Sequence, residues 1–433
     1  MLLYIAIAAG TVLAAAGVKE TAGGPRGSRG RTVYWSCLAV IALILIVPAV
    51  LRQETGNDYL RYVEFFHLAS IDSYVPTEEG FNLLVKAIYA LCGYENYLLV
   101  FAVFAVLTIL LMLTALRRQA EDFLFSFFLF MMFGYYYQSF NTMRYYFALS
   151  IVMAATIYYI QKNYPVFVLM VLAAGLFHKS ALAALVLFPL AMHVWKIWQL
   201  AAALAAGCLV TVFHGQVMTI LLLLYPSWED TTDLAAGTDI SWVNIARCAA
   251  GLLLAAIVWH LQQDPGEAAE RPEAGMESAA GAMTPASGTG KSAEAVKDAA
   301  DEGTGSVDAQ RDPAGTLRIH PAGSDGASRA LRLYVNAQML GLAIHVFGWF
   351  IPEVSRIAYY LTYTQVFLFP MLLRRIPARH VRLRKLFTAA VILAAVVYFA
   401  MFLRSCYGDT TKLLPYKSFL FHDLSQTPSG SVE

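Results

Sequence analysis

Charged residues are scarce in this chain. Of its 433 residues, 14% are Asp, Glu, Lys or Arg, whereas 58% are hydrophobic and the mean hydropathy is +0.56. Soluble domains usually have about 25% charged residues, so a water-soluble globule of this composition would expose large apolar patches. The net charge of +1 also lacks the basic excess typical of nucleic-acid-binding proteins. The composition therefore argues against a soluble enzyme or a DNA-binding protein and indicates hydrocarbon as the solvent.

The motifs of several common chemistries are missing as well. The chain contains no P-loop, no GxGxxG after a strand, no HExxH and no GxSxG, so ATP-driven transport, dinucleotide chemistry and zinc hydrolysis have no support. Its five scattered cysteines form no CxxC or Cys/His pair at metal-ligand spacing. Asp58, Glu78 and Glu79 form no tight metal-binding repeat. We therefore expect neither a metal nor a cofactor.

Long apolar runs, in contrast, are abundant. A membrane-spanning helix needs about 20 mostly apolar residues. About twelve runs reach or approach that length, at 2–18, 33–51, 97–116, 123–142, 143–160, 164–178, 180–195, 197–214, 242–261, 332–351, 357–374 and 386–403. No basic segment precedes the first run, so we expect a retained helix and not a cleaved signal peptide. The predicted fold is all-α, a polytopic membrane bundle of about twelve transmembrane helices with a disordered cytoplasmic loop.

Residues 262–331 differ in composition from the rest. They are rich in Ala, Gly, Ser, Pro, Asp and Glu and contain no Phe, Trp or Tyr, so they cannot bury enough apolar area to fold. They carry 12 acidic and 6 basic residues, which leaves a net charge of +7 on the remainder. The predicted organisation is a bundle part at 1–261 with an external loop at 52–96, an acidic cytoplasmic linker at 262–331, and a second bundle part with an external tail at 332–433. We expect the linker only to connect, with docking of a cytoplasmic partner as the alternative.

The distribution of Lys and Arg predicts the orientation of the helices. Basic residues collect at 19–31, at 117–118 and most densely at 374–385. The number of crossings between these groups allows all three to be cytoplasmic. Both termini then lie on the extracytoplasmic side. The same side holds the loop at 52–96, the turn at 141–144, the region at 178–180, and residues 215–241 and 352–356. We therefore predict a multi-pass protein of the cytoplasmic membrane, with its active site on the extracytoplasmic face.

The remaining polar residues gather on this predicted external face. Ionisable groups in or beside a membrane are costly, so each is a candidate functional residue. The loop at 52–96 supplies Asp58, Arg61 and Glu79, and its short apolar stretch at 81–94 predicts an interfacial or re-entrant helix. A carboxylate at such a boundary can be a general base with a raised pKa. The alternative is a solvated loop in which Arg61 pairs with Glu64.

A dense tyrosine belt with one cation at its centre follows at 135–146. Its candidate residues are Asn141, Arg144 and Tyr145. Interfacial tyrosines are ordinary membrane anchors, and an arginine among them can simply reach the lipid head groups. The same residues also suit a sugar and phosphate surface, because rings stack on sugars and a guanidinium binds phosphate oxygens in a fork. Both interpretations stay open.

Two further segments combine basic and aromatic residues. His178 and Lys179 stand together amid apolar residues, where a histidine can titrate near neutral pH and a lysine can offset phosphate charge. The alternative is a histidine that only satisfies a helix end. Arg356 and Tyr359 lie in the second segment, where Arg356 alternatively pairs with Glu353, a contact that contributes little to stability.

The order of these motifs resembles the EpsG family of Wzy-like exopolysaccharide polymerases. The resemblance covers about residues 33–420 without the linker and rests on Asp58-Tyr59, Glu79-Gly80-Phe81, Asn141 to Arg144, Phe177 to Ala181, and Arg356 to Tyr360. The chain departs from the family at two places. Met143-Arg144-Tyr145 stands where members look like Ile-Arg-Gln, and Glu78-Glu79-Gly80-Phe81 stands where they look like Glu-Pro-Gly-Phe. Either Glu78 or Glu79 can therefore be the counterpart of the family's acid.

The resemblance implies metal-independent joining of undecaprenyl-pyrophosphate-linked oligosaccharide repeat units on the outer face of the cytoplasmic membrane. Implied partners are this lipid-linked oligosaccharide and membrane lipids, with a flippase and a chain-length regulator as further partners and no nucleic acid. The leaving pyrophosphate needs cations and the attacking hydroxyl needs a base. The candidates for binding pyrophosphate or glycan are Arg144, Arg356, Lys179, Arg61, Asn141, Tyr145 and Tyr359. The candidate catalytic residues are His178, Asp58 and Glu79.

Two other functions stay open from the sequence. A flippase for lipid-linked oligosaccharides would favour charged residues near the membrane midplane and paired repeats, and the sequence shows neither. Another membrane glycosyltransferase, or an O-antigen-ligase-like enzyme, would share the external polar face and differ in its acceptor.

Overall fold

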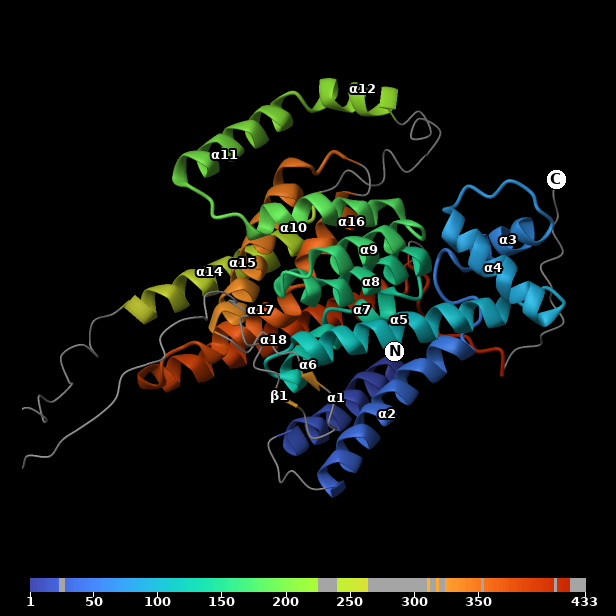
Figure 1. Cartoon of the computed structure of the whole chain (residues 1–433), viewed down its shortest axis with the longest axis horizontal. Coiled ribbons are helices and arrows are strands. Elements are labelled where there is room, and N and C mark those ends of the chain that lie inside the picture. Colours follow the sequence, from blue (N-terminus) through green and yellow to red (C-terminus); the bar gives the residue numbers. More distant parts are fainter. Residues whose placement is uncertain are drawn as a thin grey trace, which may run out of the picture.

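The computed structural model describes residues 1–22, 28–224, 240–263, 310–311, 317–318, 324–351, 354–408 and 411–420. Helices account for nearly all of the regular structure in these residues (Figure 1). The two strands, β1 (Gln310–Arg311) and β2 (Leu317–Arg318), form an antiparallel pair of two residues each. The predicted all-α class is confirmed.

Six of the described helices are long and apolar enough to cross a membrane, as a multi-pass membrane protein requires. They are α2 (Ser28–Leu51), α5 (Tyr97–Gln119), α8 (Met143–Ile160), α14 (Trp242–Gln263), α15 (Ser324–Phe347) and α18 (Val381–Ser405). The number becomes seven when α11 (Ile197–Val212) and α12 (His214–Leu224), which bend by 80° at their junction, are taken as one span.

The other predicted spans are shorter or broken helices or, in α1, a helix whose apolar part ends at Val18, so the predicted number of twelve is not confirmed. They are α1 (Leu2–Ala22), α6 (Phe123–Met132), α7 (Tyr135–Gln138), α9 (Tyr164–Gly175), η1 (Lys179–Ala183), α10 (Ala184–Met192), α16 (Val354–Thr362) and α17 (Gln365–Arg374), with η4 (Ala378–His380) before α18. Gly134, at a φ of +77°, separates α6 from α7. A helix enclosed by protein is apolar all round, so run length alone does not distinguish it from a helix that spans a membrane.

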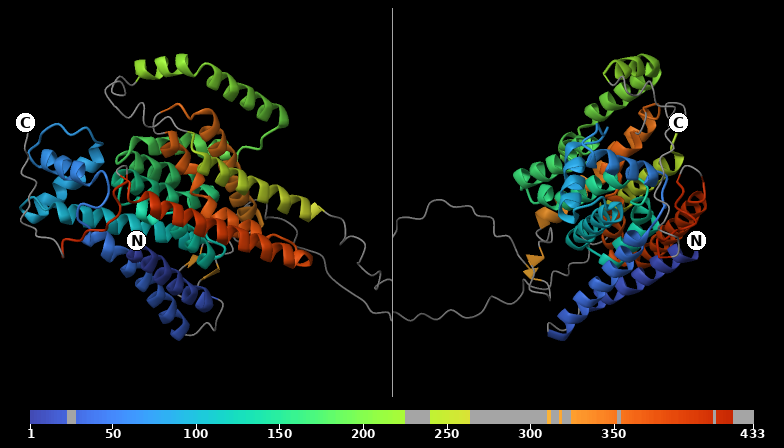
Figure 2. Two further views of the ribbon diagram at one scale, coloured as in Figure 1. Left: turned by 180° about the vertical axis from the view of Figure 1, so that it is seen from behind. Right: turned by 90° about the vertical axis from the view of Figure 1, so that its right-hand side faces the viewer.

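The helix α8 forms the centre of the bundle. Of the 18 residues in its apolar window, 83% are buried, and it packs between α5 and α9. The pair α11 and α12 projects from the edge of this bundle (Figures 1 and 2) and contacts it near the end of α15, and no residue of α11 is buried. Neighbouring α8 in the chain, Tyr135, Tyr136 and Tyr137 are buried, and the hydroxyls of the last two donate to main-chain carbonyls of Leu45 and Tyr4. These three tyrosines therefore belong to the core and not to an interfacial belt.

The predicted external loop folds into two helices at one end of the bundle, α3 (Tyr59–Ser70) and α4 (Glu79–Cys92). The short helix expected at 81–94 is thus present. Aromatic packing holds this pair to α5, because the Phe66 ring contacts the rings of Phe81 and Phe101 with centroids 5.8 and 5.1 Å apart. This packing places the start of α4 beside the start of α8.

The predicted basic group at 374–385 lies at the opposite end of the bundle, beside the start of α6. Residues 23–27 of the first predicted group lie outside the described residues. Arg375 forms an ion pair of 3.1 Å with Glu121, and Arg374 donates to the main-chain oxygen of Glu121 at 2.6 Å. Most of the predicted linker, residues 264–309, 312–316 and 319–323, lies outside the described residues. At its two ends the described helices differ from the predicted boundaries, because α14 continues to Gln263 and α15 begins at Ser324.

Gly56 provides a test of how the loop is attached to the bundle. Its φ is +103°, and an added Cβ would lie 2.6 Å from the main-chain oxygen of Phe140. We expect Gly56→Ala to lower the free energy of unfolding by about 1–3 kcal/mol through backbone strain and overpacking. The measurement is the thermal unfolding midpoint in detergent. Gly215→Ala is the matched control, because no atom lies within 4 Å of its added Cβ, and equal midpoints for the two variants would contradict the prediction.

Candidate active site

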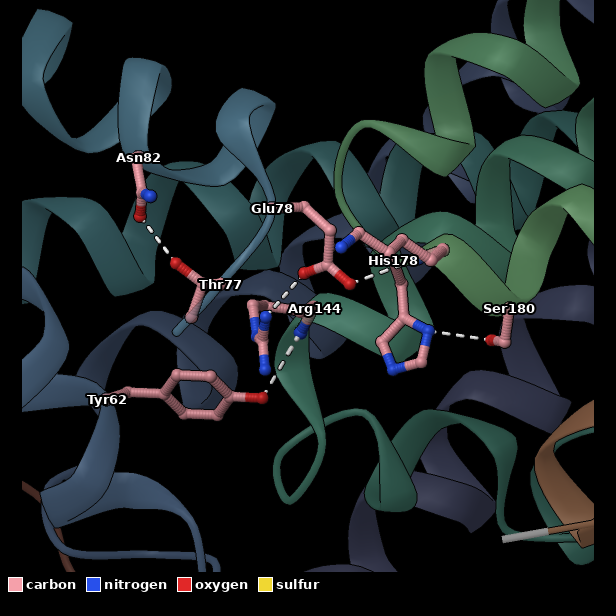
Figure 3. A network of polar contacts seen from close by, with 8 residues as sticks. Tyr62, Thr77, Glu78, Asn82, Arg144, His178 and Ser180 are labelled. Carbon is pink, nitrogen blue, oxygen red and sulfur yellow. Dashed lines mark hydrogen bonds and ion pairs between the residues drawn. The ribbon is translucent and has the colours of Figure 1, made fainter. Parts of the chain in front are cut away.

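Glu78 joins three segments that are far apart in the sequence. It precedes α4, and its carboxylate forms a short ion pair with the guanidinium of Arg144 in the first turn of α8 (Figure 3). Its other oxygen, Oε1, accepts the backbone N–H of Lys179 at 3.1 Å. The two paired side chains are 13% and 18% exposed, so water screens them only partly. Both carboxylate oxygens are occupied, which fixes Glu78 in place.

A glycine allows this close approach. The N–H of Gly80 donates to the main-chain oxygen of Leu176 at 2.9 Å, and an added Cβ would lie 2.8 Å from that oxygen. Arg144 is held from two further directions. Its guanidinium lies 5.4 Å from the ring centroid of Phe81, and its backbone N–H donates to the hydroxyl of Tyr62 at 3.5 Å. The loop before α4 and the start of α8 therefore form one unit.

His178 lies on the other side of Glu78, between α9 and η1. Its Nδ1 shares a hydrogen bond of 2.7 Å with Ser180 Oγ, which in turn lies 3.1 Å from the hydroxyl of Tyr360 (Figure 3). Burial, the largest cause, together with the charges of Arg356 and Arg144 lowers the pKa of His178 to about 4, although the charge of Glu78 acts in the opposite direction. The imidazole is therefore neutral near pH 7 and can accept a proton. Its Nε2 makes no hydrogen bond to another residue in the described part of the chain.

A first cavity, of about 480 Å³, lies beside His178. Tyr145 connects the two, because its ring meets the imidazole edge-on at 5.4 Å and its hydroxyl donates to the main-chain oxygen of Arg356 at 2.8 Å. The polar lining comes from residues of α8, α14 and α16 and the turn before α8, namely Asn141, Tyr145, Tyr146, Asn244, Arg356 and Tyr359. Val243, Met401 and Phe402 add an apolar wall. The cavity thus joins a basic polar part to an apolar part.

A second cavity, of about 640 Å³, lies beside Glu78. Its polar lining includes Thr77, Glu78, Glu79, Asn82, Lys86 and Lys179. Arg144 and His178 belong to neither lining, but each contacts a residue that does. The cluster of Glu78, Arg144 and His178 therefore lies between two cavities.

Several predicted site residues do come together. Arg144, His178 and Lys179 meet at Glu78, although Lys179 contributes its backbone N–H while its side chain is exposed. Arg356, Tyr145, Asn141 and Tyr359 line the first cavity, and Asn141 Oδ1 accepts the N–H of Asn57 at 2.8 Å.

The remaining predicted residues lie further from the cluster. Asp58 is the residue before α3, and its charge raises the pKa of Tyr62 after the larger effect of burial. Arg61 is exposed, with its guanidinium 5.5 Å from the ring centroid of Phe65. Glu79 is exposed in the first turn of α4 and lines the second cavity. Of the two acids left open by the sequence, the geometry therefore favours Glu78. The proposed Glu353 contact of Arg356 lies outside the described residues.

Sequence reasoning did not single out Arg247, which lies in the span α14. Its Nε donates to Gln365 Oε1 at 3.0 Å, and its guanidinium lies 4.1 and 4.8 Å from the ring centroids of Phe133 and Tyr398. Tyr398 also lines the first cavity, as does Asn244 one helical turn before Arg247. An arginine inside the apolar run at 242–261 was the signal that could have identified it.

Residues 35–267 match the EpsG family, which is more than half of the chain. The chain belongs to the EpsG family. Membership indicates a Wzy-like polysaccharide polymerase in general terms. The matched EpsG segment contains Glu78, Arg144 and His178 and ends before Arg356. Comparisons with curated proteins and with solved structures gave no match.

The environment of His178 predicts its titration. Diethyl pyrocarbonate reacts with neutral imidazole, so we expect the rate of modification of His178 to stay constant from pH 7 to about pH 5 and to fall toward pH 4. Peptide mass spectrometry measures this rate. Arg356→Ala removes a charge that lowers the pKa, so its midpoint shifts to higher pH. A wild-type midpoint near the ordinary histidine value of about 6.5 would contradict the electrostatic account.

Proposed function

We propose that this EpsG-family protein polymerises undecaprenyl-pyrophosphate-linked oligosaccharide repeat units on the outer face of the cytoplasmic membrane. The observation that carries the proposal is the position of His178, which lies near Arg144 and Arg356 and next to Tyr145 of the first cavity and Glu78 of the second. Polymerisation brings together two large substrates, a growing chain that leaves its lipid carrier and a new unit that attacks it. Two cavities that meet at one proton acceptor suit such a transfer.

The first cavity suits the lipid pyrophosphate of the growing chain. Arg356 supplies a cation that can bind phosphate oxygens in a fork, and Asn141, Asn244 and Tyr359 supply neutral hydrogen-bonding groups. The apolar wall that includes Met401, a residue 57% exposed, suits the first isoprene units.

The second cavity suits the acceptor sugar. Its lining is mostly polar, with the amide of Asn82 and the cation of Lys86 beside the carboxylates of Glu78 and Glu79. Sugars bind through many hydrogen bonds to their hydroxyls, and this lining offers both donors and acceptors. An acceptor hydroxyl held there lies on the Glu78 side of His178.

The reaction proposed for this site is a direct displacement. The oxygen of the acceptor hydroxyl attacks the anomeric carbon of the growing chain and forms the new glycosidic bond. The bond between that carbon and the phosphate oxygen breaks, and the lipid pyrophosphate leaves with the electron pair. The hydroxyl proton passes to Nε2 of His178. Arg144 and Arg356 stabilise the charge that develops on the leaving group.

Binding of the pyrophosphate also strengthens the base. Arg144 and Arg356 both lower the pKa of His178 in the empty site. A bound pyrophosphate offsets these two positive charges, so the pKa of His178 rises toward neutrality when the donor is present. Brønsted behaviour then makes His178 a better proton acceptor in the complex than in the free protein.

Removal of the Glu78 charge tests the site. We expect Glu78→Gln and His178→Ala each to lower the rate of polymer growth at least about 100-fold, because they disorder Arg144 and remove the proton acceptor. The assay is the length distribution of glycan made from lipid-linked repeat units in proteoliposomes. Glu64→Gln is the matched control, since Glu64 is exposed on α3 and lines neither cavity.

Variants of Glu78, Glu79 and His178 distinguish the proposed polymerase site from its alternatives. Full activity of Glu78→Gln with loss in Glu79→Gln would make Glu79 the functional acid and contradict the assignment of Glu78. In cells, the proposal predicts that single repeat units accumulate on the outer leaflet when His178→Ala stops polymerisation. Accumulation on the inner leaflet would instead indicate a flippase.

A further inference from the structure

A third cavity lies at the end of the bundle opposite His178. It has a volume of about 620 Å³ and is formed by α1, α6, α17 and α18, which we call the α6–α18 groove. The groove lies near the end of α5, because Asp122, which follows that helix, is part of its lining. The end of α5 in turn contacts the end of α8, where Arg118 donates to the hydroxyl of Tyr158 at 2.9 Å. Tyr158 stands 14 residues after Arg144 in α8, so the two ends lie about 20 Å apart along that helix. The groove is therefore separate from the candidate active site.

Three cations lie along one side of the groove. They are Arg374 at the end of α17, and Arg384 and Lys385 in the first turns of α18. Arg374 donates to the main-chain oxygen of Glu121, which carries no charge. The carboxylate of Glu121 forms its ion pair with Arg375. Within the described part of the chain, no carboxylate forms an ion pair with Arg384 or Lys385.

The groove contains one carboxylate. Asp122 stands before α6, and its Oδ1 accepts the N–H of Phe125 at 3.1 Å. The carboxylate thus caps the helix, where the partial positive charge of the N-terminus favours it. With three cations and one capping carboxylate, the lining attracts an anion.

Apolar side chains form the rest of the groove. Phe125 and Phe128 of α6 stack with centroids 6.2 Å apart, and Ile392 of α18 lies further from the cations, 40% exposed. Leu124 and Leu373 complete this wall. Free phosphate would leave the wall uncovered, and so would the acidic linker, which contains no Phe, Trp or Tyr. An acyl chain would cover it.

We propose that the α6–α18 groove is a binding site for an anionic glycerophospholipid. The phosphate lies at Arg374, Arg384 and Lys385, and the acyl chain follows Phe125, Phe128 and Ile392. Basic pockets between membrane helices are suited to anionic head groups, and each cation near the surface strengthens such binding roughly fivefold. The lipid would join α6, α17 and α18, which meet in this groove.

The experiment titrates the full-length protein in detergent with phosphatidylglycerol, phosphatidylcholine or inorganic phosphate and follows binding by native mass spectrometry. We expect one phosphatidylglycerol to bind at least tenfold more tightly than phosphatidylcholine. The variant Arg384→Ala/Lys385→Ala should lose about 25-fold in affinity for phosphatidylglycerol. Arg382→Ala is the matched control, because it removes a cation of the same helix that does not line the groove, and it should lose less than about threefold.

Ala389→Trp tests the apolar wall without a change in charge. Ala389 lines the groove and is exposed, so a bulky side chain fills the space for the acyl chain and lowers the affinity for phosphatidylglycerol at least tenfold. Unchanged binding in Ala389→Trp or in the double variant would overturn the proposal, as would equal losses in Arg382→Ala and the double variant. Saturation of the site by inorganic phosphate would indicate a phosphate site instead. Tight phosphatidylglycerol binding only after deletion of residues 270–323 would indicate that the linker occupies the groove.

Discussion

The ion pair between Glu78 and Arg144 is the contact on which the candidate active site depends. It joins the loop before α4 to the start of α8, and the second oxygen of Glu78 joins both to the backbone of Lys179. The pair is largely buried, so loss of either charge would leave the other without compensation in a poorly solvated place. Hydrogen bonds to both of its carboxylate oxygens also fix the direction of the Glu78 side chain. Positions far apart in the sequence therefore act as one structural unit.

The same unit sets the chemistry proposed for the site. Burial and two arginines keep His178 neutral, and Glu78 limits the effect of those arginines. A pyrophosphate that neutralises the arginines would raise the basicity of the histidine, which couples substrate charge to proton transfer. The Ser180 hydroxyl bound to Nδ1 orients the ring. The arrangement of Glu78 and the two arginines around His178 therefore determines both where the cations lie and how strong a base the histidine is.

The sequence predicted the all-α fold, the helix at the start of the apolar stretch 81–94, and the convergence of Arg144, His178 and Arg356 at one end of the bundle. The lengths of the apolar runs carried the first two predictions, and the motif order together with the bias of basic residues carried the third. The number of spans could not be predicted in the same way, because helices buried within protein are as apolar as helices in lipid. The sequence does not decide between Glu78 and Glu79, because the fold of the loop determines which of the two carboxylates faces Arg144. Arg247 was not predicted, because the length of the apolar run at 242–261 indicates a membrane span whether or not the run contains a single charge.

A double-mutant cycle on Glu78→Gln and Arg144→Gln tests the central claim most directly, with the free energy of unfolding in detergent as the readout. If the two side chains form the ion pair that joins α4 to α8, the single changes are not additive, and we expect a coupling energy of about 1–3 kcal/mol. Additivity within about 0.5 kcal/mol would show that the two residues do not interact, and it would contradict the account of the site.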